Sequence, residues 1–251
     1  IEQKMSKIER IHLALVSGIK QYFGKLGFSK ATLGLSGGID SAVVLALAVE
    51  ALGKENVLSV LLPSHYSSEH SVKDSLVMFG YLKSPYKIIP IEDMYHNVEK
   101  NLKPHLEDKA NDVTEENIQA RLRGLSLMAI SNKLGYILLN TTNKSEAAVG
   151  YGTLYGDMCG GLSVIGDLYK GQVYDLARHI NKEQEIIPKN IITKAPSAEL
   201  RPNQKDSDSL PDYDKLDAIL FHYIEEQLGP KEIITLGYDE ALVNRVLRLV
   251  N

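Results

Sequence analysis

Apolar and polar positions divide the first part of the chain into alternating helix-like and strand-like segments. Between residues 2 and 24, apolar side chains recur every three or four positions, which predicts an amphipathic helix before the first strand. Short apolar runs of strand length then follow at residues 30–35, 56–62, 86–91 and 136–140. Helical patterns separate these runs at residues 41–52, 69–82 and 114–134.

This alternation predicts an α/β fold, with a doubly wound parallel sheet and helices on both faces. Sheets of this kind bind ligands in the crevice beyond the carboxyl ends of the strands, where the strand order reverses. The segments that follow the four apolar runs hold many hydroxyl, carboxylate and glycine residues: 34–41, 63–68, 92–93 and 141–146. We therefore expect the functional site at this edge of the sheet.

Composition narrows the class of protein. The 251 residues suit one α/β domain spanning residues 1–251. The net charge of −4 disfavours nucleic acid as a partner. Cys159 is the single cysteine, which excludes an internal disulfide and fits a reducing cytoplasm. No apolar stretch is long enough to cross a bilayer, so we expect a cytoplasmic protein without a membrane partner.

The first apolar run leads into a loop suited to phosphate. Gly37 and Gly38 are free to adopt positive φ and let backbone N–H groups approach an anion, and the next helix directs its N-terminus toward the same point. Ser36 and Ser41 supply hydroxyl donors, and Asp40 supplies a carboxylate for Mg²⁺. The loop lacks the Gly-Lys-Ser/Thr ending of a Walker A motif. The alternative is a tight turn in which Asp40 or Ser41 only caps the helix.

Glu146 follows the fourth apolar run and offers a second carboxylate. Together with Asp40 it would complete the small ligand set of a magnesium ion that keeps most of its water and bridges to phosphates. The alternative is a capping role for the segment, with Thr142 or Asn143 as the N-cap and Glu146 in the first helical turn. The sequence leaves both interpretations open.

Two irregular segments follow. Glycines at 150, 152, 156, 160 and 161 surround Asp157 and indicate a long binding loop or, alternatively, an unstructured connection. Residues 187–214 have no strong period and read as a second mobile loop, whose cations would fold over phosphates or simply remain solvated.

Arg121 and Arg123 lie among apolar residues of the helix predicted over 114–134. Arg121 suits phosphate recognition or an interface, and the alternative is a surface arginine with an apolar stem. The histidines have no metal-ligand spacing, so we expect no zinc site. Ser36 and Ser41 have no identifiable His/Asp relay, which disfavours a serine hydrolase.

Residues 36–41, Ser-Gly-Gly-Ile-Asp-Ser, resemble the signature loop of the ATP pyrophosphatases, which cleave ATP between its α- and β-phosphates. Further segments follow in the order seen in NAD synthetases, over nearly the whole chain: Leu33–Ser41, Glu116–Arg123, Asn140–Gly152, Tyr155–Asp157, Leu168–Lys170 and Ala195–Leu200. The chain thus resembles the NAD synthetase family. Because no N-terminal amidase domain precedes these motifs, it looks like the ammonia-dependent form.

The resemblance implies an adenine nucleotide alpha hydrolase-like fold and a ligase that forms a C–N bond in NAD biosynthesis. Deamido-NAD would be amidated to NAD with ATP and ammonia, through a nicotinyl-adenylate, releasing AMP and pyrophosphate. A homodimer is also implied, with the dinucleotide site near the subunit interface.

The resemblance also assigns site residues. Asp157 and Lys170 would be catalytic, and Asp40 with Glu146 would bind Mg²⁺. The residues that would bind ATP are Gly34, Leu35, Ser36, Gly37, Gly38, Ile39, Asp40, Ser41, Thr141, Lys170 and Ser197. Arg121, Leu154 and Asp157 would contact deamido-NAD. Leu154 and Gly161 depart from the family pattern, since many relatives carry a lysine and an acidic residue there.

Two rival functions come from other classes. One is an ATP pyrophosphatase that acts on RNA, such as a tRNA-modifying ligase, against which the acidic balance and the absent cysteine pair argue. The other is a nucleotide-binding module without chemistry, in which ATP would stay intact.

Overall fold

The fold is built on a sheet of parallel strands. The computed structural model describes residues 5–106, 110 and 112–251. In this part of the chain, the sheet has five strands in the order β3-β2-β1-β4-β5, all paired in parallel. The strands are β1 (Ala31–Gly34), β2 (Val57–Leu61), β3 (Tyr86–Ile88), β4 (Ile137–Asn140) and β5 (Leu162–Ser163). The strand order runs outward from β1 in both directions, as the doubly wound prediction requires.

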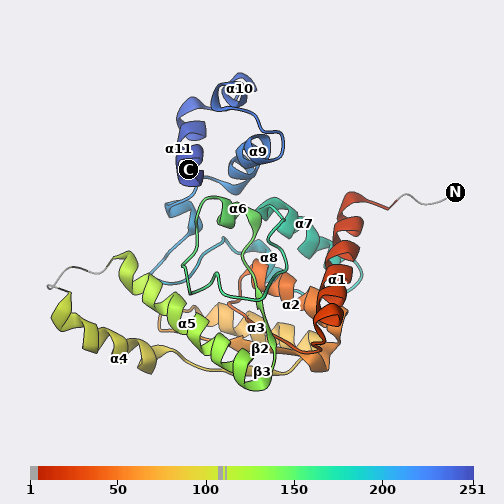
Figure 1. The fold of residues 1–251 in the computed structure, drawn as a ribbon, viewed down its shortest axis with the longest axis vertical. Coiled ribbons are helices and arrows are strands. Elements are labelled where there is room, and N and C mark those ends of the chain that lie inside the picture. The colour runs from red at the N-terminus through yellow and green to blue at the C-terminus, as the bar shows by residue number, and fades with distance from the viewer. Residues whose placement is uncertain (1–4, 107–109, 111) are drawn as a thin grey trace.

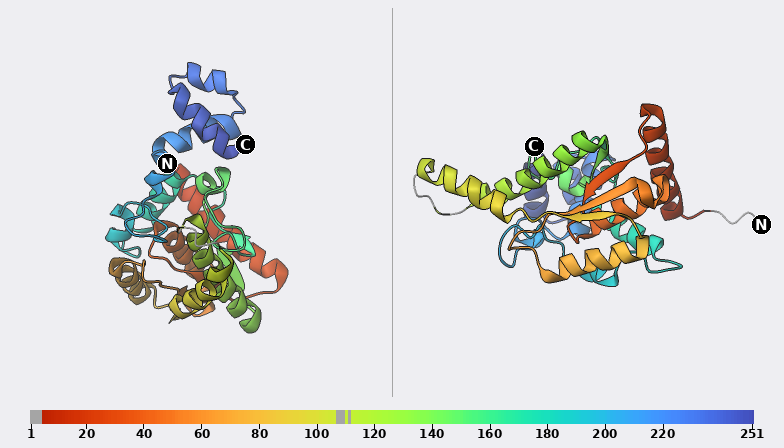
Figure 2. Two further views of the ribbon diagram at one scale, coloured as in Figure 1. Left: turned by 90° about the vertical axis from the view of Figure 1, so that its left-hand side faces the viewer. Right: turned by 90° about the horizontal axis from the view of Figure 1, so that it is seen from below.

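Helices cover both faces of the sheet (Figures 1 and 2). The longer ones are α1 (Lys7–Leu26), α2 (Ile39–Leu52), α3 (Glu69–Leu82), α4 (Glu92–Leu102), α5 (Val113–Leu134), α7 (Lys170–Ile180), α9 (Tyr213–Ile224) and α11 (Glu240–Val250). The shorter ones are α6 (Lys144–Ala148), α8 (Lys189–Thr193) and α10 (Pro230–Thr235). Helices α1, α2 and α7 pack together on one face, and α4 and α5 lie on the other.

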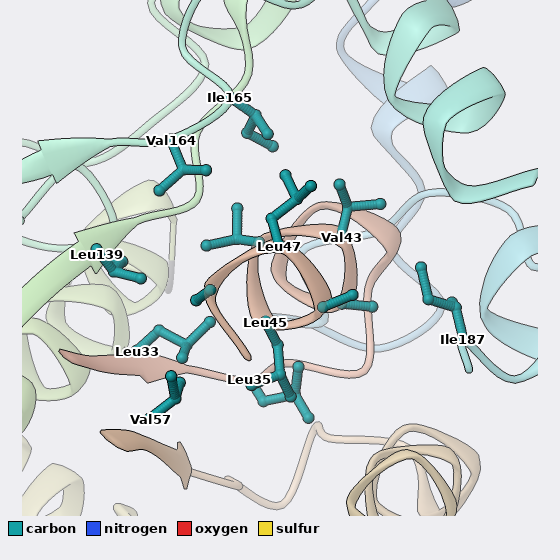
Figure 3. Packing of buried hydrophobic residues seen from close by; sticks show 14 of the residues in the cluster. Leu33, Leu35, Val43, Leu45, Leu47, Val57, Leu139, Val164, Ile165 and Ile187 are labelled. Atoms are coloured by element: carbon teal, nitrogen blue, oxygen red, sulfur yellow. The ribbon is translucent and has the colours of Figure 1, made fainter. Parts of the chain in front are cut away.

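The main core lies between the sheet and α2. Helix α2 is apolar on all sides, and its residues from Ser41 to Ala48 are buried, because the sheet covers one side and α1 and α7 cover others. Figure 3 shows Leu33 of β1 and Leu139 of β4 packed in this cluster with Leu45 and Leu47 of α2. Burial of this helix fixes its N-terminus, and therefore the glycine loop before it, against the edge of the sheet.

The C-terminal helices α9, α10 and α11 form an apolar cluster of their own. Its buried members include Leu216, Ile219, Ile233, Val243 and Val246. Figure 1 shows this C-terminal helical cluster beyond α6 and α7, at the end of the molecule away from β2 and β3. Helix α9 contacts both α6 and α7, so it joins the cluster to the sheet domain.

The four predicted strands and three predicted later helices are present; α3 has the predicted bounds, and the ends of the others differ by at most three residues. The helices α4, α7, α9 and α10 were not predicted. The first helix begins at Lys7, and residues 2–4 of its predicted range lie outside the described residues. Residues 187–214, predicted as an irregular loop, contain α8 and a 3-10 turn at Asp206–Asp208. Strand β5 was not predicted, because its two residues are too few to show a periodicity.

Among the described residues, no helix is both long enough and apolar enough to pass through a membrane.

Candidate active site

A cavity of about 270 Å³ opens where the strand order reverses, between the carboxyl ends of β1 and β4. All eight residues from Gly34 to Ser41 line it. The other predicted site residues in its wall are Thr141, Glu146, Asp157, Lys170 and Ser197. The fold thus brings together segments that are more than 150 residues apart in the sequence.

The glycine loop takes its shape from one positive φ angle and two hydroxyls. Gly37 has φ +78°, and a Cβ placed there would lie 2.6 Å from the carbonyl oxygen of Ser71, so only glycine fits without a shift. Gly38 has φ −90°, so the expectation of positive φ is wrong for this residue. The Ser41 hydroxyl donates to the Gly38 carbonyl at 3.1 Å, and the Gly38 N–H donates to Ser36 Oγ at 3.2 Å.

Neither Asp40 nor Ser41 caps helix α2. Helix α2 has Gly38 as its N-cap, and no side chain accepts a capping hydrogen bond there. The N-terminal N–H groups and the positive end of the helix macrodipole therefore face the cavity without a side-chain acceptor of this kind. This arrangement suits an anion such as phosphate.

Lys170 lies between the two carboxylates predicted to bind magnesium. Its Nζ atom is 2.6 Å from Oδ2 of Asp40 and 3.1 Å from Oε1 of Glu146, and its side chain is only 2% exposed. Asn143 supports the pair, because its Nδ2 donates to Oδ1 of Asp40 at 2.9 Å. Sequence reasoning paired Asp40 with Glu146 but did not predict that Lys170 joins them in one ion-pair cluster.

Glu146 has the capping role that the sequence left open, and its carboxylate also lines the cavity. Asn143 is the N-cap of α6 and accepts from the Glu146 N–H at 3.0 Å, while its own N–H donates to Oε2 of Glu146 at 3.3 Å. The other oxygen, Oε1, faces Lys170. A capping box therefore orients the carboxylate toward the cavity.

Charge in the cluster is unbalanced, since two carboxylates share one ammonium. Burial and the neighbouring Asp40 charge raise the pKa of Glu146 to about 8, although Lys170 opposes the rise. The two carboxylates outweigh the desolvation of Lys170 and raise its pKa above the usual value. Lys170 is consequently charged at neutral pH, where Glu146 keeps a proton, and further positive charge at the cluster would favour its ionised form.

The carboxylates of the cavity can be compared with the ligands that the predicted magnesium ion requires. In the part of the chain that the structure describes, no group of three His, Cys, Asp or Glu side chains could hold a metal. Of the carboxylates that line the cavity, Asp40 and Glu146 lie on either side of Lys170. This set fits Mg²⁺ in the mode where one or two carboxylates hold it and water and substrate phosphates fill the other positions.

Asp157 is held at the other side of the cavity by the glycine-rich loop. Its Oδ1 accepts from the Thr153 N–H at 2.6 Å, and its carbonyl oxygen accepts from Nδ2 of Asn140 at 3.0 Å. Although Asp157 is at the surface, the protein around it displaces water and raises the pKa of its carboxyl above the usual range, against three backbone hydrogen bonds. The expected binding loop is thus an ordered turn around this carboxylate.

Arg121 and Leu154 lie outside the cavity wall. Nε of Arg121 donates to the Leu154 carbonyl at 3.2 Å, and the Leu154 side chain is exposed. The arginine that does line the cavity is Arg123, which sequence reasoning did not select. It donates to the Leu62 carbonyl at 2.9 Å, and burial lowers its pKa to about 10. The only indication in the sequence that Arg123 faces inward was its position among apolar residues of the predicted helix.

The loop after α8 closes a further side of the cavity. Ser197 donates to the Gln204 carbonyl at 2.6 Å. Glu199 accepts from the Ser68 and Ser71 hydroxyls at 2.9 Å and 2.8 Å and pairs with Lys194. Asp206, also in the wall, accepts from the Tyr213 hydroxyl at 2.8 Å. Sequence reasoning singled out only Ser197 for this site.

Comparison with known proteins gives a family match over most of the chain. Residues 11–251 match the family model described as NAD synthase. The "Glutamine-dependent NAD(+) synthetase" of Synechocystis sp. is 52% identical over 246 residues, which cover 98% of this chain and 44% of that protein. The chain thus spans less than half of that relative's length.

Two solved structures share the fold over nearly the whole chain. The NH3-dependent NAD synthetase from Campylobacter jejuni, in complex with nitrate, has a TM-score of 0.78 at 28% identity and covers 98% of this chain and 94% of that one. The NMN synthetase from Francisella tularensis has a TM-score of 0.80 at 27% identity, covering 98% and 97%.

Proposed function

This chain belongs to the NAD synthase family, and we propose that it amidates deamido-NAD to NAD with ATP and ammonia. The observation that carries the proposal is the Lys170–Asp40–Glu146 cluster beside the phosphate-suited loop. The Lys170 ammonium, the two carboxylates and the backbone N–H groups at the start of α2 are the groups that would bind a triphosphate and support its cleavage.

The chemistry explains why ATP is needed. A carboxylate resists attack by an amine, because its charge repels nucleophiles and its oxygen is a poor leaving group. The nicotinate carboxylate attacks the α-phosphorus of ATP, pyrophosphate leaves, and a nicotinyl-adenylate forms. Ammonia then attacks the acyl carbon, a proton is lost, and AMP leaves. The protein accelerates both steps by holding the reactants in line and by stabilising charge on the phosphates.

Each part of the cavity takes a share of this task. The backbone of Gly34–Ser41 and the hydroxyls of Ser36 and Ser41 bind phosphate oxygens. Thr141 and Ser197 bind ATP from the loops on either side of it. Lys170 stabilises the negative charge that develops as pyrophosphate leaves, because a preorganised ammonium in a buried site acts strongly on such charge.

Asp40 and Glu146 would hold Mg²⁺. The ion, when bound, neutralises the phosphates and polarises the bond to the leaving pyrophosphate. Asp40 and Glu146 are held toward the cavity by Asn143 and by the capping box of α6. Lys170 holds the two carboxylates close together.

The nicotinate end of the substrate would lie near Asp157. Its carboxylate orients the incoming ammonium and accepts the proton that ammonium loses when it becomes ammonia. The raised pKa of Asp157 favours this role. Arg123, inside the cavity, adds positive charge on the same side. Arg121 and Leu154 would contact the dinucleotide where it leaves the cavity, and a homodimer would cover this rim.

The nitrogen donor at this site is free ammonia in our proposal. Synechocystis has a relative named for glutamine dependence, whereas the Campylobacter jejuni structure is named for NH3 dependence. Ammonia is the simpler nucleophile for the described cavity, and a glutamine requirement would need a further amidase site to release it.

The test is an omission assay. The purified chain is mixed with Mg²⁺, ATP, deamido-NAD and ¹⁵N-ammonium, each left out in turn, and labelled NAD, AMP and pyrophosphate are quantified. Equal amounts of the three products, lost on every omission, are expected. Parallel reactions replace ammonium with glutamine, and deamido-NAD with nicotinate mononucleotide because of the NMN synthetase likeness.

The outcomes separate the alternatives. Amidated product from nicotinate mononucleotide but not from deamido-NAD would show that the mononucleotide is the substrate. Product from glutamine but not from ammonium would overturn ammonia as the donor. Bound but intact ATP with every substrate would favour a binding module, and AMP formed only with added tRNA would favour an RNA-acting ligase.

A further inference from the structure

Asp217 connects the C-terminal helical cluster to the two segments that carry Glu146 and Lys170. It lies on α9, whose apolar face packs against α10 and α11. Its Oδ1 accepts from the Ser145 hydroxyl, and its Oδ2 accepts from the Gly171 N–H at 2.8 Å. A single carboxylate thus holds the neighbours of two site residues.

These hydrogen bonds form a continuous chain. The Lys170 N–H donates to Ser145 Oγ at 2.9 Å, and the same hydroxyl donates onward to Asp217. Ser145 is fully buried, so water does not substitute for either partner. The first turns of α6 and α7 are therefore joined through Ser145 and Asp217.

Asp217 also lies where a negative charge stabilises a helix. Lys170 and Gly171 begin α7, and their N–H groups have no acceptor within the helix itself. A carboxylate at this end satisfies one of them directly and favours the helix macrodipole. A Cβ on Gly171 would lie 3.4 Å from Oδ2 of Asp217, which shows how closely the carboxylate approaches the backbone.

A second contact from α9 reaches the Lys170 side chain. The ring of Tyr213, at the start of α9, has its centroid 5.1 Å from Nζ of Lys170. The Tyr213 hydroxyl is held by Asp206 at 2.8 Å. Helix α9 thus contacts Lys170 at its side chain and, through Ser145, at its backbone.

We propose that Asp217 is a positioning residue, which sets the distance between the Lys170 ammonium and the Glu146 carboxylate and so couples the C-terminal helical cluster to ATP binding. The inference rests on the proposed function in that ATP is the ligand of this cavity. Asp217 acts through the backbone of α6 and α7.

Asp217→Asn tests this with little change in shape. If the amide oxygen keeps the bond from the Gly171 N–H, its NH₂ faces the Ser145 hydroxyl, which then loses its acceptor, and the negative charge is lost as well. Asp214→Asn is the matched control, because Asp214 is an exposed acid on the same helix. Ser145→Ala is the second variant, since it breaks the same chain from α6.

Two readouts are measured on the full chain. The first is the dissociation constant of Mg-ATP, for which we expect a rise of about tenfold in both test variants and none in Asp214→Asn. The second is the steady-state kinetics of NAD formation, where kcat should fall about tenfold while KM for deamido-NAD changes less than about twofold.

A double-mutant cycle distinguishes positioning from a general loss of structure. In a Lys170→Gln background, Asp217→Asn should weaken Mg-ATP binding by less than about twofold, because the group that it positions is gone. Independent, additive effects would overturn the inference, as would unchanged Mg-ATP binding in folded Asp217→Asn and Ser145→Ala. If circular dichroism shows that Lys170→Gln is unfolded, Glu146→Gln takes its place in the cycle.

Failure of the proposed function gives a different result. Mg-ATP binding without NAD formation would contradict the reaction, yet the binding cycle would still decide the role of Asp217. Absence of Mg-ATP binding in the unaltered chain would overturn both.

Discussion

The Nζ atom of Lys170 lies 2.6 Å from Oδ2 of Asp40, although the two residues are 130 positions apart in the sequence. Lys170 begins α7 and Asp40 lies in the first turn of α2. The ion pair therefore joins the N-termini of two helices that pack together on one face of the sheet. Each partner depends on the other, because a buried charge without a partner is strongly unfavourable.

Replacing Lys170 with glutamine should affect both stability and activity. The change leaves Asp40 and Glu146 as adjacent buried carboxylates, and we expect the free energy of unfolding to fall by about 3 kcal/mol in urea titrations at pH 8. The rate of NAD formation should fall at least about 100-fold. Lys215→Gln, at an exposed position on α9, is the matched control and should change neither. Full turnover in Lys170→Gln would contradict the role given to the ammonium.

The raised pKa of Glu146 predicts a pH dependence of stability. The pKa of Glu146 is about 8 in the folded protein, against its ordinary value of 4.5, so the folded state keeps a proton between these pH values that the unfolded state releases. Stability from this group is therefore present below pH 4.5 and is lost as pH rises toward 8. The slope is at most about 1.4 kcal/mol per pH unit.

Glu146→Gln isolates this contribution, because glutamine does not titrate. Urea unfolding of both proteins at several pH values from 5 to 8.5 should show that the unaltered chain loses stability relative to the variant as pH rises. A constant difference across this range would mean that Glu146 is ionised throughout, and would contradict the raised pKa.

Gly37→Ala should disturb the glycine loop both through backbone strain and through a steric clash. Gly37 and Gly27 have similar φ angles of +78° and +72°, but only at Gly37 would a Cβ meet another atom, the Ser71 carbonyl oxygen at 2.6 Å. Gly27→Ala, with open space around it, should cost about 1 kcal/mol of stability and leave Mg-ATP binding unchanged. Gly37→Ala should also weaken Mg-ATP binding at least about tenfold in calorimetric titrations, or about 1.4 kcal/mol. Equal effects of the two substitutions would contradict the close packing of the loop against α3.

Asn140→Ala should release the loop that carries Asp157. The Asn140 Nδ2 donates to the Asp157 and Cys159 carbonyls at 3.0 Å and 3.3 Å, and its Oδ1 accepts from the Thr142 N–H at 2.9 Å. Loss of these buried bonds should lower the free energy of unfolding by about 1–3 kcal/mol and speed limited proteolysis within residues 150–161. In Asn56→Ala, where the lost bond goes to the Leu52 carbonyl away from the cavity, cleavage in this loop should stay slow. Unchanged cleavage in Asn140→Ala would show that other contacts hold the loop.

Local sequence was sufficient for the parts of this protein that depend on periodicity and on contiguous motifs. Apolar runs predicted four strands of a parallel α/β sheet, since parallel strands buried on both faces require continuous apolar residues. Residues 36–41 predicted the phosphate-suited loop, because glycines, hydroxyls and a carboxylate stand side by side there. The strand β5 was missed because two residues are too short for a pattern, and the helices α4, α7, α9 and α10 were not predicted either.

Which distant side chains come into contact depends on tertiary packing. The crossover from β3 to β4 brings Glu146 beside Asp40, and α7 then places Lys170 between them, a relationship that no local spacing encodes. The same holds for Arg123, which faces the cavity while Arg121, two residues away, faces outward, since 200° of helical rotation separates them. Local sequence therefore specified four of the strands, the helices between them and the types of chemical group at the strand ends. Packing of α2, α5 and α7 against the sheet determined the distances and burial, and therefore the charges, of those groups.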